Sequence, residues 1–362
     1  MQYGKKRILV APLDWGLGHA SRSIAVIKAL LAREVDVLLG SYGRPLALLR
    51  REFPQLESIE LPPYDVKYPT GNIYFNVAIQ LPQILKAMAQ ENRIVAGLVN
   101  KKQLDGIISD HRLGCRNPGV PSVVIAHQLH LRLKYPWLRW PVREFHYGIL
   151  RRFDEVWIPD YEATEDSLAG NLDHPPVPAP PATYIGPLSR IGYRETPSAY
   201  DAFILLSGPE PQRTRLEEVL LKQAVQLEGN ILLVQGKTDV EQQARQEGNV
   251  EIIPYLTSAD LEEKLAASKI VICRSGYSTL MDLASCRKKA LLVPTPGQTE
   301  QEYLSDYLQQ KGFFLSKNQS EINLSVHLPE ALEYKGFPPA PPGPSLLESA
   351  LDGFLKRVEA AS

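Results

Sequence analysis

A short polar segment between two apolar stretches carries residue types that could bind a charged ligand. Residues 270–272 form a β-branched apolar run typical of a buried strand, and Ser275 and Gly276 end it. Apolar residues return at helical spacing from Leu280, so we predict a strand, a tight turn and a helix that begins near 277–279. The first turn of a helix presents unpaired backbone N–H groups and the positive end of the helix dipole. The segment therefore predicts an anion site, most simply for phosphate.

The same helix also offers a hydrogen-bond acceptor. Asp282 follows Thr279 by three residues, which places both on one helix face, where the carboxylate could accept from two neighbouring hydroxyl groups. A second apolar strand, 290–293, leads through Pro294 to a polar helix start at 300–302. The segment thus offers hydrogen-bond donors for a phosphate, an acceptor for a diol and a second polar cluster. These are the groups that binding of a sugar nucleotide requires.

Residues 269–314 resemble the donor-binding region of GT-B glycosyltransferases, in particular family 28. In that family an S-G-x-x-T-x-x-E pattern precedes a strand, a proline and a glutamine-rich turn. The matching residues here are Ser275, Gly276, Thr279, Asp282, Pro294 and Gln301. Two positions depart from the pattern, because Asp282 replaces the ribose-binding glutamate and the paired glutamines become Gln301 and Glu302. The resemblance implies that these residues, together with Arg274, bind the donor.

The N-terminal segment predicts a strand at 7–11, a glycine loop at 12–18 and a helix at 21–33, with Ser21 or His19 near the helix cap. A dinucleotide-binding site is not expected, because Ser21 stands where the third glycine belongs and Gly40, Ser41 and Tyr42, rather than an acidic residue, follow the second strand. A Walker A site is excluded as well, since Ile231 occupies the position of its leading glycine.

The loop residues Gly16, Gly18, His19 and Arg22 resemble the G-x-G-H motif of related GT-B enzymes, which implies that they lie on the acceptor side. Inverting transfer needs a base for the proton of the acceptor hydroxyl, and an imidazole suits this role near neutral pH. His19 is our first candidate for this catalytic base, and Asp14 is the second. The alternative is that His19 only caps its helix.

Two further polar clusters follow predicted strands, Asp110 within 109–112 and His127 within 127–130. Ligands of open α/β sheets bind beyond the carboxyl ends of strands, so both clusters could line the acceptor side, or they could be ordinary loop residues. No carboxylate or cysteine recurs at metal-ligand spacing, and the chain lacks a D-x-D motif. We therefore expect neither a metal nor a cofactor, and the resemblance implies a UDP-sugar as co-substrate.

The second half of the chain repeats the arrangement of the first. A strand at 202–206 ends in Ser207 and Gly208 and precedes a helix, as two Rossmann-like halves would. The resemblance implies that Ser207, Gly208 and Arg213 contact the diphosphate. It also implies that Tyr255, after the strand at 250–253, lies in the loop that contacts the uracil.

Alternating strands and helices over 362 residues predict an α/β protein with two domains. The resemblance implies the GT-B architecture, with two Rossmann-like domains facing across a cleft and a C-terminal helix that returns to the first domain. We place the acceptor-side domain at 1–190, the nucleotide-sugar domain at 200–335 and the returning helix at 345–360.

Composition limits the partners of the protein. A net charge of −1 gives no general attraction to nucleic acid. The three cysteines lack paired spacing and are expected to be reduced thiols. The apolar run near the N-terminus is too short for a signal peptide, and no apolar run is long enough to span a bilayer. We expect a cytoplasmic protein.

Residues 129–153 interleave arginine and lysine with tryptophan, tyrosine and phenylalanine. This mixture suits a peripheral contact with the inner face of a membrane or with an anionic acceptor, but it also suits a flap whose charges are only solvated. Pro136 and Pro141 predict that no continuous helix runs through the first half of this segment.

The resemblance, together with these features, implies a metal-independent, inverting hexosyltransferase. It would move a hexose or N-acetylhexosamine from a UDP-sugar to a hydroxyl of an acceptor that the sequence does not identify, with a lipid or a cell-envelope component as candidates. The alternatives are a UDP-N-acetylglucosamine 2-epimerase of the same architecture and a sugar-nucleotide-binding protein without catalysis.

Overall fold

The computed structural model describes residues 5–64, 73–130, 136–174, 180–237 and 243–361. The chain divides into two compact units, one formed by residues 1–188 with 342–362 and the other by residues 189–341.

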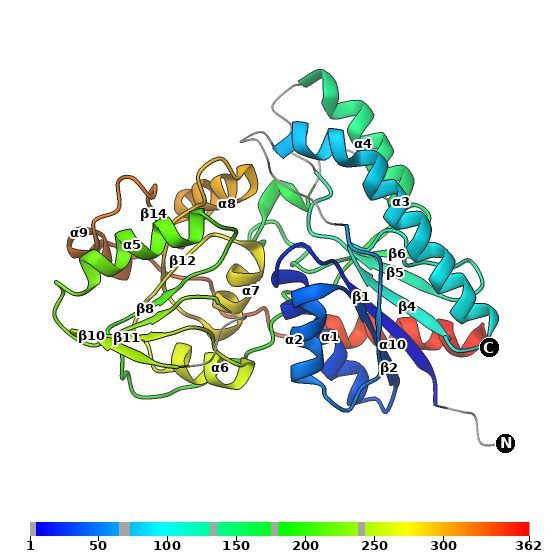
Figure 1. The fold of residues 1–362 in the computed structure, drawn as a ribbon, viewed down its shortest axis with the longest axis horizontal. Helices are drawn as coiled ribbons and strands as arrows, with labels where there is room; N and C mark the ends of the chain where they lie inside the picture. The colour runs from blue at the N-terminus through cyan, green and yellow to red at the C-terminus, as the bar shows by residue number, and fades with distance from the viewer. Residues whose placement is uncertain (1–4, 65–72, 131–135, 175–179, 238–242, 362) are drawn as a thin grey trace. The chain divides into compact units, whose positions relative to one another are not determined.

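The first unit is built on a parallel sheet with the order β3-β2-β1-β4-β5-β6-β7 (Figure 1). The strands are β1 (Arg7–Pro12), β2 (Asp36–Ser41), β3 (Ser58–Glu60), β4 (Gly106–Asp110), β5 (Ser122–Ile125), β6 (Glu155–Ile158) and β7 (Ala182–Tyr184). The helices are α1 (Gly18–Leu31), α2 (Gly43–Glu52), α3 (Ile73–Asn100), α4 (Pro136–Leu150), the 3₁₀ turn η1 (Gly170–Leu172) and α10 (Leu346–Ala360). Strands such as β1 are continuous apolar runs because helices cover both faces of a parallel sheet.

The C-terminal helix α10 packs within this first unit, where Figure 1 draws it in red beside α1. Phe354 meets the ring of Trp157 edge-on, with ring centroids 5.9 Å apart, and both side chains are fully buried. At the surface, Arg33 Nε donates to Asp352 Oδ1 at 2.8 Å. The chain ends are therefore both part of the first unit.

The second unit has the strand order β10-β11-β9-β8-β12-β13-β14. Its strands are β8 (Ala202–Leu205), β9 (Ile231–Val234), β10 (Arg245–Glu247), β11 (Val250–Ile253), β12 (Val271–Cys273), β13 (Ala290–Leu292) and β14 (Leu315–Ser316). Its helices are α5 (Gln212–Ala224), α6 (Ser258–Ala266), α7 (Tyr277–Cys286), α8 (Thr299–Gln310) and α9 (Leu324–Leu332). Only the edge pair β10–β11 is antiparallel among the described strand pairs.

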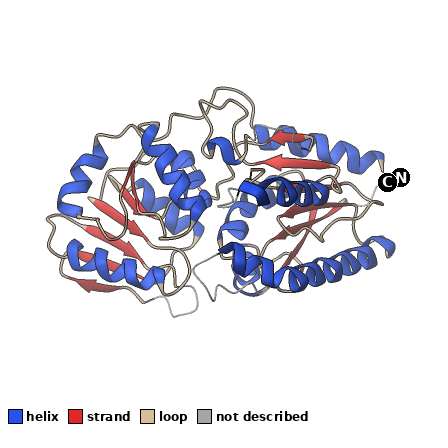
Figure 2. Ribbon diagram, turned by 90° about the horizontal axis from the view of Figure 1, so that it is seen from above, coloured by secondary structure: helices blue, strands red, loops and turns tan. Residues whose placement is uncertain are grey.

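The predicted α/β class with two Rossmann-like halves is confirmed, and Figure 2 shows helices outside the strands in each unit. When the parallel strands of each unit are numbered along the chain, their order across the sheet includes 3-2-1-4-5-6. This is the strand order of dinucleotide-binding folds. This order reverses direction between β1 and β4 and again between β8 and β12. Ligands of such sheets bind at the carboxyl ends of the strands on either side of the reversal.

Two local predictions are wrong. Helix α1 begins at Gly18 rather than Ser21, and its N-cap residue Leu17 makes no side-chain cap bond, so neither His19 nor Ser21 caps it.

Helix α4 is continuous and contains Pro141, while Pro136 is its first residue. The first helical position suits proline, because its missing N–H has no partner there in any helix. Burial of Tyr147 and Leu150 against the sheet stabilises the helix beyond Pro141 and offsets the lost hydrogen bond.

Candidate active site

One predicted catalytic residue, His19, meets one predicted acceptor-side residue, Asp110, at the reversal of the first unit's strand order. His19 lies in the first turn of α1, directly after β1, and Asp110 is the last residue of β4. The two strands are neighbours, with Pro12 in register with Asp110. The fold therefore places these two side chains together although 91 residues separate them in the chain.

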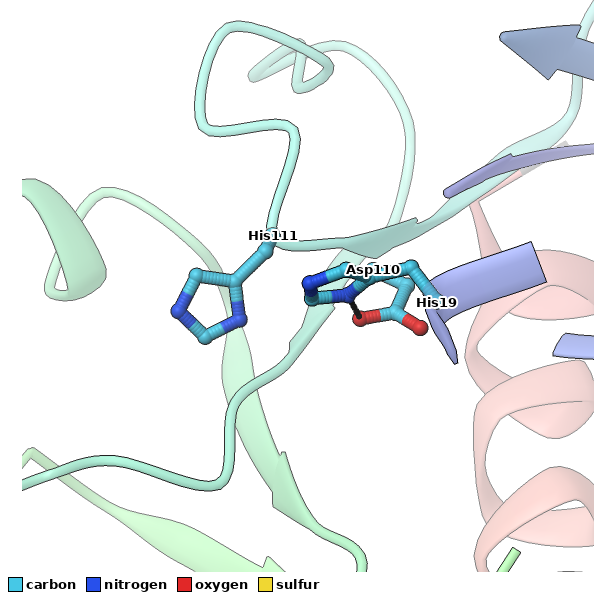
Figure 3. A group of neighbouring side chains, drawn as sticks. All are labelled: His19, Asp110 and His111. Atoms are coloured by element: carbon cyan, nitrogen blue, oxygen red, sulfur yellow. Dashed lines mark hydrogen bonds and ion pairs between the residues drawn. The ribbon is translucent and has the colours of Figure 1, made fainter. Parts of the chain in front are cut away.

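His19 and Asp110 form a hydrogen-bonded pair (Figure 3), with 2.9 Å between His19 Nδ1 and Asp110 Oδ1. Arg22 Nη2 also lies 3.0 Å from this Nδ1, but it bonds Asp110 Oδ1 as well, so it does not need Nδ1 as an acceptor. An ionised carboxylate only accepts hydrogen bonds, so the bond to Asp110 places the proton on Nδ1 of His19. The other ring nitrogen, Nε2, then keeps its lone pair. This is the tautomer in which an imidazole can remove a proton from a substrate.

Arg22 connects this pair to His127. It lies one helical turn after His19 and is almost fully buried. Its guanidinium bonds both carboxylate oxygens of Asp110, with 2.7 Å from Nε to Oδ2. Nη1 of Arg22 lies 3.0 Å from Nδ1 of His127, the residue predicted after β5. His19, Asp110 and His127 are thus brought together around one buried cation.

The environment sets the charges of these groups. Burial would raise the pKa of Asp110, but Arg22 and then His19 hold that pKa well below its usual range. Burial lowers the pKa of His19, and Arg22 adds to the effect while Asp110 opposes it. Near neutral pH the cluster therefore holds an ionised carboxylate and a neutral imidazole, which is the ionisation state required for a general base.

His111 is a third imidazole at this site. Its ring centroid lies 5.6 Å from that of His19 and 5.8 Å from that of His127. Its backbone has φ of 62°, in the left-handed region, which typically costs about 1 kcal/mol or more for a residue other than glycine. The sequence analysis grouped it with Asp110 but assigned it no role. Its position directly after Asp110 was the available signal.

Asp14, the second candidate base, is engaged elsewhere. Arg112 Nη2 lies 3.2 Å from its Oδ1, and the backbone N–H of Tyr64 donates to its Oδ2 at 3.2 Å. Its carboxylate serves as a counter-ion to a fully buried arginine, so His19 is the better placed base. Gly16, in the same loop, has φ of 72°, a conformation that favours glycine, and Gly18 is the first residue of α1.

The same cluster is the one group among the described residues that could hold a metal ion. Single ligand atoms of His19, Asp110 and His111 all lie within 4.8 Å of one another. However, the guanidinium of Arg22 already bonds both oxygens of Asp110 and opposes a second positive charge. The donor set thus fits a proton-transfer site better than a metal site.

In the second unit the predicted anion site lies at the start of α7, which follows β12. Gly276 is the N-cap residue of this helix and makes no side-chain cap bond. Ser275 Oγ donates to the carbonyl oxygen of Gln301 at 2.8 Å, and Gln301 Oε1 accepts from the backbone N–H of Thr295 at 2.9 Å. A Cβ atom on Gly276 would lie 3.9 Å from Gln301 Nε2. The motif residues from α7 and α8 are therefore adjacent.

Ser207 and Gly208 are exposed beyond the end of β8, the neighbour of β12. Gly208 has φ of 106°, and a Cβ atom there would lie 4.0 Å from Thr295 Oγ1. That hydroxyl is buried and has no hydrogen-bond partner in the described part of the chain. Thr295 is a polar group of this site that the sequence analysis missed, because a lone threonine after a strand carries no motif.

Asp282 is buried on α7, and its Oδ1 accepts a hydrogen bond from Ser189 Oγ at 2.6 Å. Burial raises the pKa of this carboxyl, whereas Arg190 and the bond from Ser189 oppose the shift. Thr279 is half-buried one turn earlier on the same helix. The carboxylate predicted to accept from a diol is therefore buried on α7, and a hydroxyl of this chain already bonds one of its oxygens.

Two predicted donor-binding arginines are engaged within the second unit. Arg213 bonds Glu210, Glu217, Thr214 and the carbonyl oxygen of Gln235. Arg274 donates to the carbonyl oxygens of Val293, Pro294 and Gln212 and to Gln319. These hydrogen bonds hold the loops at the carboxyl ends of the strands. Either arginine would have to break one of them to contact a ligand directly.

The remaining two predicted residues lie at the same end of the sheet. Glu302 is exposed on α8, and its Oε1 accepts from the backbone N–H of Gly297 at 2.8 Å. Tyr255 is half-buried directly after β11.

Known proteins resemble this chain in one domain, over nearly its whole length, and over one short segment. Residues 212–335 match the glycosyltransferase family 28 C-terminal domain. An uncharacterised glycosyltransferase of Methanosarcina mazei is 25% identical over 96% of this chain and 95% of its own. A UDP-N-acetylglucosamine–N-acetylmuramyl-(pentapeptide) pyrophosphoryl-undecaprenol N-acetylglucosamine transferase of Rhodopseudomonas palustris is 38% identical over 58 residues, 16% of this chain and 15% of its own.

Two solved structures share the whole fold. MurG of Acinetobacter baumannii superposes with a TM-score of 0.58 at 15% identity, covering 97% of this chain and 99% of its own. The spinosyn rhamnosyltransferase SpnG, solved with thymidine diphosphate, superposes with a TM-score of 0.59 at 14% identity, covering 98% and 96%.

The fold, the family match and these relatives define a glycosyltransferase of the GT-B class. Within that class the chain is similar to family 28, because the model of that family's C-terminal domain matches residues 212–335.

Proposed function

We propose that this glycosyltransferase moves a hexose or N-acetylhexosamine from a UDP-sugar to a hydroxyl group of its acceptor, with inversion at the anomeric carbon. The observation that carries this proposal is the buried His19–Asp110 pair, at 2.9 Å. A base that frees Nε2 for the acceptor proton supports direct attack of the hydroxyl, which inverts the anomeric centre in one step.

The chemistry divides between the two units. His19 takes the proton of the acceptor hydroxyl as its oxygen attacks, and Asp110 with Arg22 holds the imidazole in the required tautomer. Negative charge grows on the departing diphosphate, and the N-terminus of α7 at Gly276 supplies unpaired N–H groups and a positive dipole to stabilise it. These groups supply the stabilisation that a metal ion provides in other transferases, so we propose transfer without metal or cofactor.

Two observations support uridine as the base of the donor. The local match at 38% identity is to a transferase named for UDP-N-acetylglucosamine, and the family 28 domain spans the same unit that holds the motif residues. SpnG was solved with thymidine diphosphate, so thymidine is the competing choice. The Ser275, Gly276 and Gln301 cluster suits the diphosphate of either nucleotide.

We also propose that α4 contacts an anionic lipid surface, which would suit a lipid or cell-envelope acceptor at the cytoplasmic face of a membrane. Trp137, Trp140 and Phe145 are exposed on this helix by 73%, 66% and 49%, and Arg139 and Arg143 lie between them. Residues 131–135 of the predicted segment lie outside the described residues. No helix in the described ranges is long and apolar enough to cross a bilayer.

The test is UDP release from a panel of UDP-sugars and dTDP-sugars, with sugar, lipid and phenolic acceptors, in the presence of EDTA. The wild type should release UDP only with a matching acceptor, and His19→Ala should lower turnover roughly 10²–10⁴-fold while UDP still binds. Equal turnover in wild type and His19→Ala would end the assignment of the base.

A further inference from the structure

His111 lies at the first unit's site in an uncommon backbone conformation, bridged to Pro12. It directly follows β4, with φ of 62° in the left-handed region. Its Nδ1 atom is buried and has no hydrogen-bond partner among the residues that the structure describes. Buried polar atoms are rarely left without a hydrogen bond. Residues other than glycine that have a left-handed backbone concentrate at sites that bind ligands.

The distance between two imidazoles supplies the second step. One ring nitrogen of His19 and one of His111 lie within 4.8 Å of each other, and Figure 3 shows the two rings side by side, from α1 and from the end of β4. A single oxygen atom that hydrogen-bonds two nitrogens at 2.8 Å and a tetrahedral angle spans about 4.6 Å between them. A gap of up to 4.8 Å between these two nitrogens therefore leaves room for one hydroxyl oxygen that contacts both rings.

We propose that His111 is a second catalytic residue, whose N–H donates to the attacking oxygen of the acceptor while His19 removes that oxygen's proton. The inference rests on the proposed function and assigns the acceptor hydroxyl a place between the two rings. Burial first, and then His19 and His127, keep the pKa of His111 well below its ordinary value, so its ring is neutral and has one donor and one acceptor nitrogen.

The step balances as follows. The acceptor oxygen forms a bond to the anomeric carbon, and its proton passes to Nε2 of His19. The bond from the anomeric carbon to the diphosphate oxygen breaks, and UDP leaves with the electron pair. His111 keeps its proton throughout, and its hydrogen bond orients the oxygen before attack, with one lone pair directed at the anomeric carbon.

The first arm of the test uses His111→Gly, because glycine adopts a left-handed φ freely and the backbone is not disturbed. Lys102→Gly is the matched control, since Lys102 is exposed, lies in the same unit and has φ of 55°. Both variants should keep a Tm close to that of the wild type and the Tm shift produced by UDP. We expect His111→Gly to lower kcat for UDP release at least 10-fold with the acceptor found active, and Lys102→Gly to leave kcat within twofold.

The second arm does not depend on turnover. The protein contains seven histidines, so a sample with ¹⁵N-labelled imidazoles gives a simple spectrum. Glycerol at about 1 M serves as the hydroxyl probe. In the wild type the ring-nitrogen signals of His19 and His111 should shift together, and in His111→Gly the shift of His19 should fall by at least half.

The outcomes separate the two claims. Loss of turnover in His111→Gly with an intact UDP response supports the inference, whereas turnover within twofold of the wild type overturns it. A wild type that turns over no nucleotide sugar contradicts the proposed function, and the glycerol titration then decides the hydroxyl site alone. A His19 signal that shifts equally in wild type and His111→Gly overturns the inference in that case too.

Discussion

The Nδ1 atom of His19 lies 2.9 Å from Oδ1 of Asp110, and the partner of this bond comes from the neighbouring strand of the sheet. Asp110→Asn should therefore lower turnover roughly 10²–10⁴-fold, because an amide no longer fixes the tautomer that frees Nε2. The affinity for UDP, measured by calorimetry, should change less than threefold, since we propose that the nucleotide binds to residues of the second unit.

Glu91→Gln is the control for the loss of a buried carboxylate. Glu91 Oε1 pairs with Arg112 Nη1 at 2.6 Å, and both side chains are fully buried, as are Asp110 and Arg22. Each variant removes the closest carboxylate partner of a buried arginine and should lower Tm, although Asp14 stays 3.2 Å from Arg112 in Glu91→Gln. Only Asp110→Asn should lose turnover per folded molecule, and an equal loss in both variants would mean that Asp110 acts through stability alone.

The rate should depend on pH through His19. Burial and the nearby Arg22 and His127 lower the pKa of His19 from its ordinary value of 6.5, although Asp110 opposes them. The base is active when neutral, so kcat should be level above about pH 6.5 and fall only as pH drops through the lowered pKa. A profile with its acid limb above pH 7 would contradict this assignment.

Stability should also fall in acid, and His146 is one identifiable cause. Burial lowers the pKa of His146 from 6.5 to about 4. Between these values the unfolded chain binds a proton that the folded protein does not, so stability is full above pH 6.5 and is lost as pH falls toward 4. The loss is about 3 kcal/mol from this group. Urea unfolding of His146→Gln should show a smaller decrease in unfolding free energy between pH 7 and pH 4.5 than the wild type.

Asp282 should govern donor binding rather than chemistry. Asp282→Ala removes the acceptor predicted for the ribose hydroxyls and should weaken UDP binding about 10-fold, while single-turnover rates at saturating donor change little. Asp306→Ala, an exposed acidic residue on α8, is the charge-matched control and should bind UDP like the wild type. If Asp282→Ala binds UDP normally, the bond from Ser189 to Asp282 is only structural.

The aromatic side chains of α4 should bind anionic vesicles. The double variant Trp137→Ser with Trp140→Ser should sediment with phosphatidylglycerol vesicles at least fivefold less than the wild type at low salt, and salt should weaken the wild-type binding. Tyr193→Ser, which alters an exposed aromatic residue of the second unit, is the control. No wild-type binding at low salt would remove the membrane proposal.

Much of the fold follows from local pattern. The continuous apolar run of β1 and the repeated strand, glycine loop and helix predicted two Rossmann-like halves, because such strands need cover on both faces. The course of α4 did not follow, since tertiary packing of Tyr147 and Leu150 outweighs the effect of Pro141. Short edge strands such as β3 and β10 were missed because three residues carry too little periodicity to be recognised.

The site was predictable where the sequence identified both a candidate residue and the strand that places it. His19, Asp110 and His127 were candidates from their places after strands, and the parallel pairing brought them together. The bonds that occupy Arg213 and Arg274 were not predictable, because their acceptors are mostly backbone carbonyl oxygens of distant loops. The role of His111 depends on its left-handed backbone, which no residue pattern announces.

The measurement that tests the central claim most directly is a thermal-shift series with UDP, dTDP, GDP, ADP and NADH in EDTA, on wild type and His19→Ala. A ligand at 100 times its Kd adds about 2.7 kcal/mol, which corresponds to a shift of several degrees. We predict that UDP raises the Tm of both proteins equally without metal. No response to UDP or dTDP, or a response to NADH alone, would contradict the assignment of a nucleotide-sugar site.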